Sequence, residues 1–341
     1  MMKPAVADAP AVRDAPDAWR ELLDEQLREI GADLPASVWE RVLVGPARDV
    51  LVRPGKQFRA NLVYIAWQLA GGAASGPPPA LIAAIEMLHA GSLIIDDIED
   101  EAETRRGAPA LHRTHGVALA LNTGNWMYFA AFDLLDRAGL AEPVRVALHG
   151  AMLRGVLACH RGQALDIGHD VTRVARGELR AVVSCATELK AGALTRLATE
   201  LGALAAGASA ERLAAIAAFG SALGSGLQML DDLGSVTAAA RIAKSREDLW
   251  QLRPTWAWVW TAETADDASW HRGLRWAQDV ARRREDPEAI ARFLGGFAVA
   301  AGRVEVRARL AAAQAALSAF ADANTMAFVD AELARLEASY G

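Results

Sequence analysis

Three acidic residues, Asp96, Asp97 and Asp100, follow a segment at 83–95 that is almost wholly apolar. In a helix, a spacing of four residues places Asp96 and Asp100 on one face, where like charges repel each other. A hard cation bound by carboxylate oxygens would relieve this repulsion, and Mg²⁺ prefers one or two carboxylates completed by phosphate oxygens and water. A solvated acidic helix end is the alternative, and these three residues alone leave both interpretations open.

Basic residues around these acids indicate an anionic ligand. Arg105 and Arg106 follow the acids, while Lys56 and Arg59 precede them at the predicted start of a helix. Arginine forks match phosphate oxygens bidentately, whereas lysine binds them as a compact point charge. Only four of the 36 basic residues are lysines. Lys56 and Lys190 are therefore candidates for phosphate binding, with chance as the alternative.

A second acidic pair, Asp231 and Asp232, ends the apolar segment 213–230 and is preceded by Gln228. The segment approaches the length of a membrane span, but it is dominated by small residues, so a buried central helix is predicted rather than a transmembrane one. The two acid clusters, about 135 residues apart, are each predicted to end an apolar helix. We expect them to face one cavity, with Mg²⁺ ions joining them to a diphosphate.

The composition excludes several classes of protein. Hydrophobic residues make up 52% of the 341 residues and charged residues 23%, which excludes a disordered chain. The net charge of −6 argues against binding to a nucleic-acid backbone. The two cysteines, Cys159 and Cys185, cannot form a disulfide framework, so a reducing, cytoplasmic setting is expected.

Alanine and leucine are abundant and both favour helices, so we predict an all-α fold. The charged and proline-rich N-terminus contains no apolar signal region. Residues 1–18 are predicted to form a flexible N-terminal arm, and residues 19–341 a single domain. The Pro/Gly-rich stretch at 71–79 is predicted to be a loop between two helices.

From about residue 55 to residue 255, the chain resembles the trans-isoprenyl diphosphate synthase (polyprenyl synthetase) family. The first aspartate-rich motif of that family resembles Asp96-Asp97-Ile-Glu-Asp100 with Arg105-Arg106-Gly107 at the matching distance. Further segments resemble other motifs of the family: Gly55-Lys56-Gln-Phe-Arg59, the histidine at His89, Gly162-Gln163-Ala-Leu-Asp166, Lys190, and Leu227-Gln228-Met-Leu-Asp231-Asp232.

This resemblance implies an isoprenoid synthase-type helical bundle around a deep apolar cavity, usually as a homodimer. It implies that about three Mg²⁺ ions assist the departure of diphosphate from an allylic substrate. Isopentenyl diphosphate then attacks the resulting cation, and a proton is lost. The physical requirements agree, because ionisation needs neutralisation of the leaving group and the cation needs a dry cavity.

The resemblance also implies roles for individual residues. Asp96, Asp100 and Asp231 would bind the metal, with Asp97 and Asp232 beside them. The remaining predicted contacts are to substrate. Arg105, Lys190 and Arg253 would hold the allylic diphosphate, and Lys56, Arg59, His89 and Arg106 the isopentenyl diphosphate. Gln228 is a further predicted substrate contact.

Several positions depart from the family pattern. Ser235 stands where the second motif has its third aspartate, which should weaken the third metal site. Ala191 follows Lys190 in place of a threonine. Arg253 stands in place of a lysine, and Leu252 in place of the glycine before it. Asn125 and Ala60 replace an aspartate and a proline of other motifs.

Two alternatives remain beside chain elongation. A class I terpene cyclase would need the metals but no second substrate, so the presence of Lys56, Arg59, His89 and Arg106 favours elongation. Six of the ten tryptophans lie within residues 250–276; they could stabilise a carbocation, although ordinary helix packing explains them as well. A non-catalytic subunit of a heteromeric synthase is disfavoured by the complete first acid cluster.

Two small residues suggest the product length. Ser92 and Gly91 are the fourth and fifth residues before Asp96, where bulky side chains block the growing chain in the family. Their small size predicts a product of twenty carbons or more. A bulky residue on a neighbouring helix could close the same space.

Overall fold

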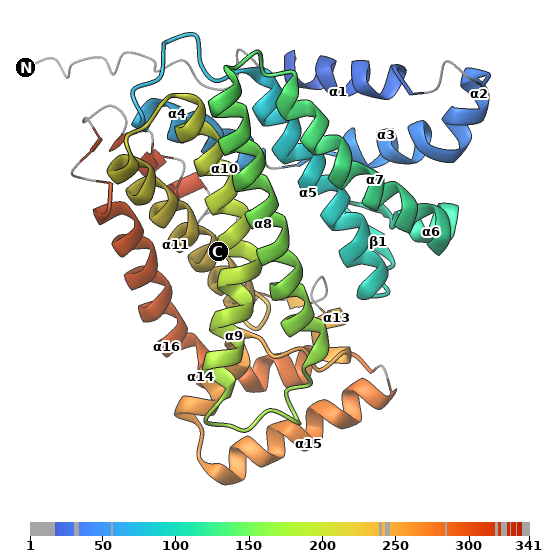
Figure 1. Cartoon of the computed structure of the whole chain (residues 1–341). Helices are drawn as coiled ribbons and strands as arrows, with labels where there is room; N and C mark the ends of the chain where they lie inside the picture. The colour runs from blue at the N-terminus through green and yellow to red at the C-terminus, as the bar shows by residue number, and fades with distance from the viewer. Residues whose placement is uncertain are drawn as a thin grey trace, which may run out of the picture.

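The chain folds into a bundle of α-helices, described here from a computed structural model (Figure 1). The structure describes residues 18–30, 34–55, 57–238, 241–242, 246–283 and 285–317, and in the C-terminal region 320–321, 326–327, 329–331 and 333–335. Within these residues the only strands are the two-residue pair β1 (Thr104–Arg105) and β2 (Ala108–Pro109). The predicted all-α class is confirmed.

The first half of the bundle consists of short N-terminal helices followed by three long ones. They are α1 (Ala18–Arg28), α2 (Ala36–Trp39), the π-helical η2 (Glu40–Val44), α3 (Gly45–Leu51), α4 (Phe58–Leu69), α5 (Pro79–Glu99), α6 (Leu111–His115), α7 (Val117–Asp136) and α8 (Glu142–Gly168).

The second half continues the same packing. Its helices are α9 (Leu179–Thr187), the π-helical η3 (Glu188–Gly192), α10 (Ala193–Ala205), α11 (Ala210–Gly234), α13 (Arg246–Trp250), α14 (Trp256–Thr264), α15 (Asp267–Arg283) and α16 (Glu288–Ala315).

The long helices position the acidic residues. α5 begins with proline at its first helical position, where the missing N–H costs nothing, and it packs mainly against α7. α10 packs against α4, α8 and α11, and α11 packs also against α16 (Figure 1). The buried apolar side chains of the described residues form one continuous core. The acidic ends of α5 and α11 are therefore fixed by packing along most of their length.

α11 is the buried helix predicted over residues 213–230. Ser209 caps its N-terminus, its side chain accepting a hydrogen bond from the backbone N–H of Arg212 (3.3 Å). By length and composition α11 could span a membrane, but 56% of its apolar window is buried inside the protein. A core helix passes the same test, and the packing of α11 against α10 and α16 is that of a core helix.

The tryptophan-rich segment packs the bundle. Trp256, Trp258 and Trp260 on α14 are all buried, and the rings of Trp256 and Trp260 lie 5.8 Å apart. Their indole N–H groups donate to Thr187 Oγ1 (2.9 Å) and Glu305 Oε2 (2.8 Å) respectively. Buried indoles with satisfied N–H groups account for these residues as helix packing.

The predicted N-terminal arm lies outside the described residues, except for Ala18, which is the first residue of α1. The stretch at 71–79 connects α4 to α5 as predicted, with Pro79 already in the helix.

Candidate active site

The first acid motif occupies the C-terminal end of α5, where three basic side chains converge on it. Asp96 accepts hydrogen bonds from Lys190 Nζ (3.1 Å) and Arg105 Nη2 (3.3 Å). Asp97 is buried and accepts from Arg105 Nε (2.6 Å). Asp100 pairs with Arg253 Nη2 (3.1 Å). The structure thus brings together six of the predicted site residues from three distant parts of the chain.

The charges within this cluster shift the acidic groups in different directions. Burial, reinforced by the charge of Asp96, raises the pKa of Asp100 to about 6, although Lys190 and Arg253 oppose it. Burial also raises the pKa of Asp97 against the effect of Arg105. At Asp96 burial acts the same way, but Lys190 and Arg105 outweigh it and lower the pKa. The cluster retains uncompensated negative charge, as a cation site requires.

A tight hairpin presents the two arginines that follow the motif. Arg106 (φ 54°) and Gly107 (φ 80°) both lie in the left-handed region between β1 and β2. Two such residues in a two-residue loop are typical of a type I′ turn. The hairpin directs Arg105 towards α5, while Arg106 Nη1 donates to the carbonyl of Arg53 (3.3 Å).

Lys190 reaches the acids from the π-helical segment η3. Its Nζ also donates to Asp166 Oδ2 (2.9 Å) on α8. A Cβ added to Gly162 would lie 2.7 Å from the backbone nitrogen of Lys190, so only glycine allows α8 and η3 to approach this closely. Burial alone would lower the pKa of Lys190, but Asp96 and Asp166 outweigh it and raise the pKa. The lysine therefore stays charged at any physiological pH.

A second basic group surrounds His89, which lies about two helical turns before Asp96 on α5. Arg59 Nη1 donates to His89 Nε2 (3.0 Å). Burial, together with the charges of Arg59, Arg106 and Arg105, holds the pKa of His89 well below its usual range, so the ring is neutral. Glu86 lies in the same group and has its pKa raised by burial, against the effect of Arg59 and Arg106. Lys56, predicted to act with them, lies outside the described residues.

The second acid motif ends α11 and differs in its surroundings. Asp231 forms an ion pair with Arg241. Asp232 is buried and accepts hydrogen bonds from Gln228 Nε2 (2.8 Å) and the backbone N–H of Trp256 (2.9 Å). Burial raises the pKa of Asp232 to about 7 despite these donors. The hydroxyl of Ser235 donates to the backbone carbonyl of Asp232 (2.6 Å). The amide of Gln228, predicted to contact substrate, is thus bound to Asp232.

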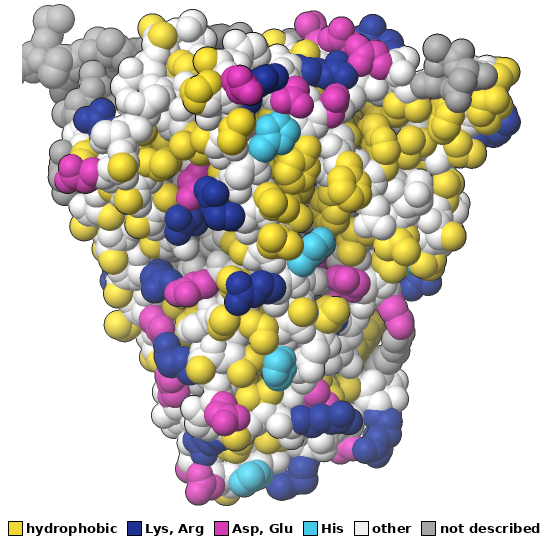
Figure 2. Space-filling model, in the orientation of Figure 1, with side chains coloured by type: hydrophobic (Ala, Val, Ile, Leu, Met, Phe, Trp, Pro, Cys, Tyr) yellow, Lys and Arg dark blue, Asp and Glu magenta, His cyan; other side chains and the backbone are white. Residues whose placement is uncertain are grey.

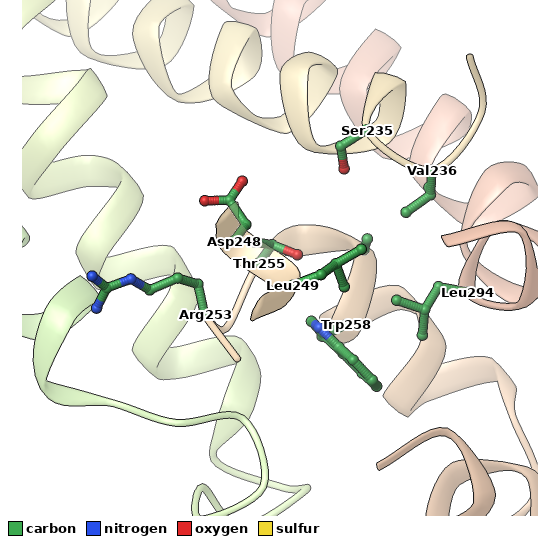
Figure 3. Close-up of a pocket in the computed structure, with 9 residues that line it drawn as sticks. Ser235, Val236, Asp248, Leu249, Arg253, Thr255, Trp258 and Leu294 are labelled. Atoms are coloured by element: carbon green, nitrogen blue, oxygen red, sulfur yellow. The ribbon is translucent and has the colours of Figure 1, made fainter. Parts of the chain in front are cut away.

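Asp248 connects the two motifs electrostatically. Burial raises its pKa well above the usual range, and the charges of Asp232, Asp166 and Asp100 add to the effect. It lines a cavity of about 10 Å³ together with Ser235 (Figure 3), which is room for about one water molecule. In Figure 3 the side chain of Arg253 points away from the other lining residues. Asp248 therefore lies close enough to both acid clusters to feel the charges of Asp232 and Asp100.

Leu252 shows why the family has a glycine at this position. Its φ of 58° lies in the left-handed region, which costs a residue with a Cβ about 1 kcal/mol. The conformation directs Arg253 back into the site, where Nη1 donates to the carbonyl of Asp166 (3.0 Å).

The sequence interpretation missed several residues of the site. Asp166 was recognised within a motif but given no role, and Asp248 and Glu86 were given none. Asp248 could have been identified as a candidate from its position shortly before Arg253, a predicted site residue. Nothing in the sequence indicated Arg241, since it is one of many arginines and forms its contact only through the fold.

The two small residues predicted to set product length have different surroundings. A Cβ on Gly91 would lie 2.9 Å from the carbonyl oxygen of Gly124 and 3.4 Å from Cδ1 of Tyr128, both on α7. Close packing of α5 on α7 therefore explains the glycine as well. Ser92 donates to the carbonyl of His89 (2.8 Å). Tyr128 is a bulky residue on a neighbouring helix, which is the alternative means of closing the space beside Gly91 and Ser92.

The sequence profile of the polyprenyl synthetase family matches residues 40–293. The chain belongs to the polyprenyl synthetase family. It is 37% identical over 172 residues to geranylgeranyl pyrophosphate synthase 2 of Zymoseptoria tritici, an alignment that covers 49% of this chain and 47% of that protein. The chain spans about half the length of such curated relatives.

Solved structures establish the isoprenoid synthase fold of this polyprenyl synthetase family member. Geranylgeranyl pyrophosphate synthetase from Pyrococcus horikoshii superposes with a TM-score of 0.80 at 22% identity, covering 97% of both chains. A second is geranylgeranyl pyrophosphate synthase from Corynebacterium glutamicum, complexed with isoprenyl diphosphate and magnesium. It gives a TM-score of 0.76 at 22% identity over 97% of this chain and 99% of that one.

The donor set at the first motif fits Mg²⁺. Asp96 and Asp100 lie four residues apart at the C-terminal end of α5, so their carboxylates share one face. Among the described residues no three acidic, histidine or cysteine side chains converge into a preformed metal cluster. Mg²⁺ commonly takes one or two carboxylates and completes its shell with phosphate oxygens and water, and Asp96 and Asp100 offer two such carboxylates.

Proposed function

We propose that this protein is a prenyltransferase that condenses isopentenyl diphosphate with an allylic diphosphate. The observation that carries the proposal is the presence of two separate basic groups. Lys190, Arg105 and Arg253 surround the first acids, while Arg59 and Arg106 surround a neutral His89. An enzyme that only cyclised one substrate would need the first group alone.

Each group has a distinct task in the reaction. Asp96 and Asp100 would hold Mg²⁺, which supplies electrophilic assistance to the departing diphosphate when bound. Lys190 and Arg105, which pair with Asp96 and Asp97, would bind the phosphate oxygens of the allylic substrate. Arg59 and Arg106 bind the second diphosphate, and the neutral ring of His89 can donate one N–H to it. Isopentenyl diphosphate then attacks the allylic cation, and the product loses a proton.

The product is proposed to have twenty carbons or more. Ser92 on α5 is small, and Tyr128 on α7, whose ring lies 5.5 Å from that of His160 on α8, is the bulky residue beside Gly91. We expect Tyr128→Ala to lengthen the product by one or more five-carbon units, and Ser92→Phe to shorten it. Gly91→Phe is a poorer test because it would force α5 and α7 apart. Unchanged products from both Tyr128→Ala and Ser92→Phe would contradict this assignment.

The deciding experiment is a product assay with Mg²⁺ and farnesyl or geranylgeranyl diphosphate, with and without isopentenyl diphosphate. Elongation predicts a longer prenyl alcohol that appears only with isopentenyl diphosphate and only after phosphatase treatment. A hydrocarbon or cyclic alcohol formed without either would establish cyclisation instead. No diphosphate release under any condition would support the role of a non-catalytic subunit.

A homodimer is part of the proposal. Large apolar side chains are exposed along α7 and α8, with exposed fractions of 74% at Phe129, 65% at Val146 and 55% at Leu157. Figure 2 shows hydrophobic side chains gathered where Figure 1 places these helices. Exposed apolar patches of this kind mark interaction sites, and a second copy of this chain is the proposed occupant. Phe129→Lys should convert a dimer to a monomer in light scattering; an unchanged mass would contradict the dimer.

A further inference from the structure

The second acid motif holds a guanidinium group at its more exposed carboxylate, that of Asp231. Arg241 Nη2 pairs with Asp231 Oδ1. The arginine stem crosses directly over Gly234, since a Cβ there would lie 2.5 Å from Nε and 2.9 Å from Cδ of Arg241. The Arg241 side chain is only 20% exposed, while that of Asp231 is 47% exposed. The last turn of α11 thus has room for this arginine because Gly234 carries no side chain.

The remaining oxygen atoms of the motif are already bound within the protein. Asp232 accepts from Gln228 and from the backbone of Trp256. Ser235, at the position of the missing third carboxylate, donates to the backbone of Asp232, and Thr237 Oγ1 donates to the carbonyl of Leu233 (3.1 Å). A divalent cation needs several oxygen ligands, and this motif offers one carboxylate that already has a positive partner.

The first motif differs in its balance of charge. Its acids Asp96, Asp97 and Asp100, together with Asp166, outnumber the basic groups that contact them, Lys190, Arg105 and Arg253. A metal ion bound there corrects a deficit. At the second motif Asp231, the more exposed carboxylate, is paired with Arg241, so a metal ion would first have to displace the arginine.

We propose that Arg241 takes the place of a metal ion at the second acid motif. Ions bind at the first motif only, and the guanidinium held by Asp231 supplies the remaining positive charge to the diphosphate that lies between the motifs. This inference rests on the proposed function for the presence of that diphosphate. The expected number of bound metal ions therefore falls from about three per chain to about two.

The test counts metal ions rather than turnover. Mn²⁺ is titrated into the full chain with inorganic pyrophosphate, and free Mn²⁺ is measured by electron paramagnetic resonance. We expect about two ions per chain in the wild type and the same number in Asp231→Asn. The double variant Arg241→Gln with Ser235→Asp should bind a third ion. Three ions in the wild type, falling to two in Asp231→Asn, would overturn the proposal.

A second measurement follows the arginine itself. Arg241→Gln should weaken the binding of pyrophosphate in the presence of Mg²⁺ by about 10- to 100-fold, the effect of losing a charge-assisted hydrogen bond. Gly234→Ala displaces the arginine without removing its charge and should weaken binding in the same direction, by less. Helix propensity favours alanine over glycine, so this variant should fold. Arg292→Gln, which removes an exposed arginine paired with Glu288 on α16, is the matched control and should leave binding unchanged.

The outcomes separate this inference from the proposed function. Two Mn²⁺ ions and arginine-dependent pyrophosphate binding without any prenyl product would contradict the proposed elongation and support the inference. Elongation with three bound ions, or with pyrophosphate binding indifferent to Arg241→Gln and Gly234→Ala, would contradict the inference and leave elongation standing.

Discussion

The two acid motifs look alike in sequence, because each consists of aspartates that end a long apolar helix, but the fold gives them different surroundings. At the end of α5, Asp96 and Asp100 lie on one face with Asp166 nearby, and the basic side chains that contact them leave a deficit of positive charge. At the end of α11, Asp231 pairs with Arg241, and Asp232 accepts hydrogen bonds from Gln228 and Trp256. Carboxylates at helix ends are therefore not equivalent metal ligands, since the neighbouring charges and donors decide what they can bind.

The largest expected effect is a difference in kcat/KM between variants of the two acid motifs. Asp100→Asn should lower kcat/KM by at least about 1,000-fold, because electrophilic assistance from a metal ion contributes several kcal/mol to the barrier. Asp231→Asn should cost about 30-fold or less, since Arg241 retains its charge. Steady-state kinetics of both variants, with circular dichroism to confirm folding, makes the comparison. Equal losses would break the distinction drawn between the motifs.

A pH dependence of stability sharpens the description of the second motif. The pKa of Asp232 is raised from 3.8 to about 7 by burial, so the folded metal-free protein binds a proton there that the unfolded chain releases above about pH 4. Its contribution to stability is complete at low pH and is lost as the pH rises towards 7. The free energy of unfolding should fall by about 2–3 kcal/mol between pH 5 and 7.5 from this group.

Asp232→Asn is the variant that isolates this effect. Urea unfolding in the presence of a chelator should show a shallower pH slope than the wild type, because asparagine does not titrate. Its one carbonyl oxygen can still accept from the backbone N–H of Trp256, while its NH2 group can donate to the side-chain oxygen of Gln228 once that amide turns over. Asp100, with a pKa of about 6, adds a slope of the same sign that remains in this variant. An identical slope in both proteins would show that Asp232 is ionised throughout.

The smallest expected effect concerns the basic group around His89. A Cβ on Gly55 would lie 3.2 Å from the guanidinium of Arg106, so Gly55→Ala should push that arginine slightly aside. We expect the KM for isopentenyl diphosphate to rise about 3-fold, with that for the allylic substrate unchanged. Gly296→Ala on α16, where a Cβ would meet nothing within 4 Å, is the control. A rise in the allylic KM instead would show that Arg106 serves the other diphosphate.

Much of this protein is determined by its sequence. The abundance of Ala and Leu and the long apolar segments dictate helices, and the all-α class follows from local preferences. The acids at 96–100, the adjacent arginines and Lys190 are residue types suited to metals and phosphates, so their chemistry could be predicted from composition and spacing. Even Leu252 could be identified as a departure, although its strained backbone became visible only in the structure.

Tertiary structure decided which charges meet. Lys190 and Asp96 are 94 residues apart and Arg253 and Asp100 are 153 apart, and no local pattern specifies such pairs. Long-range contacts also explain the assignment of the tryptophans to packing, the position of Tyr128 beside Gly91 and the placement of Arg241 over Gly234. Local sequence fixes the type of a charge and the helix that bears it, but electrostatic interactions depend on distance and burial, which arise only when the helices pack together.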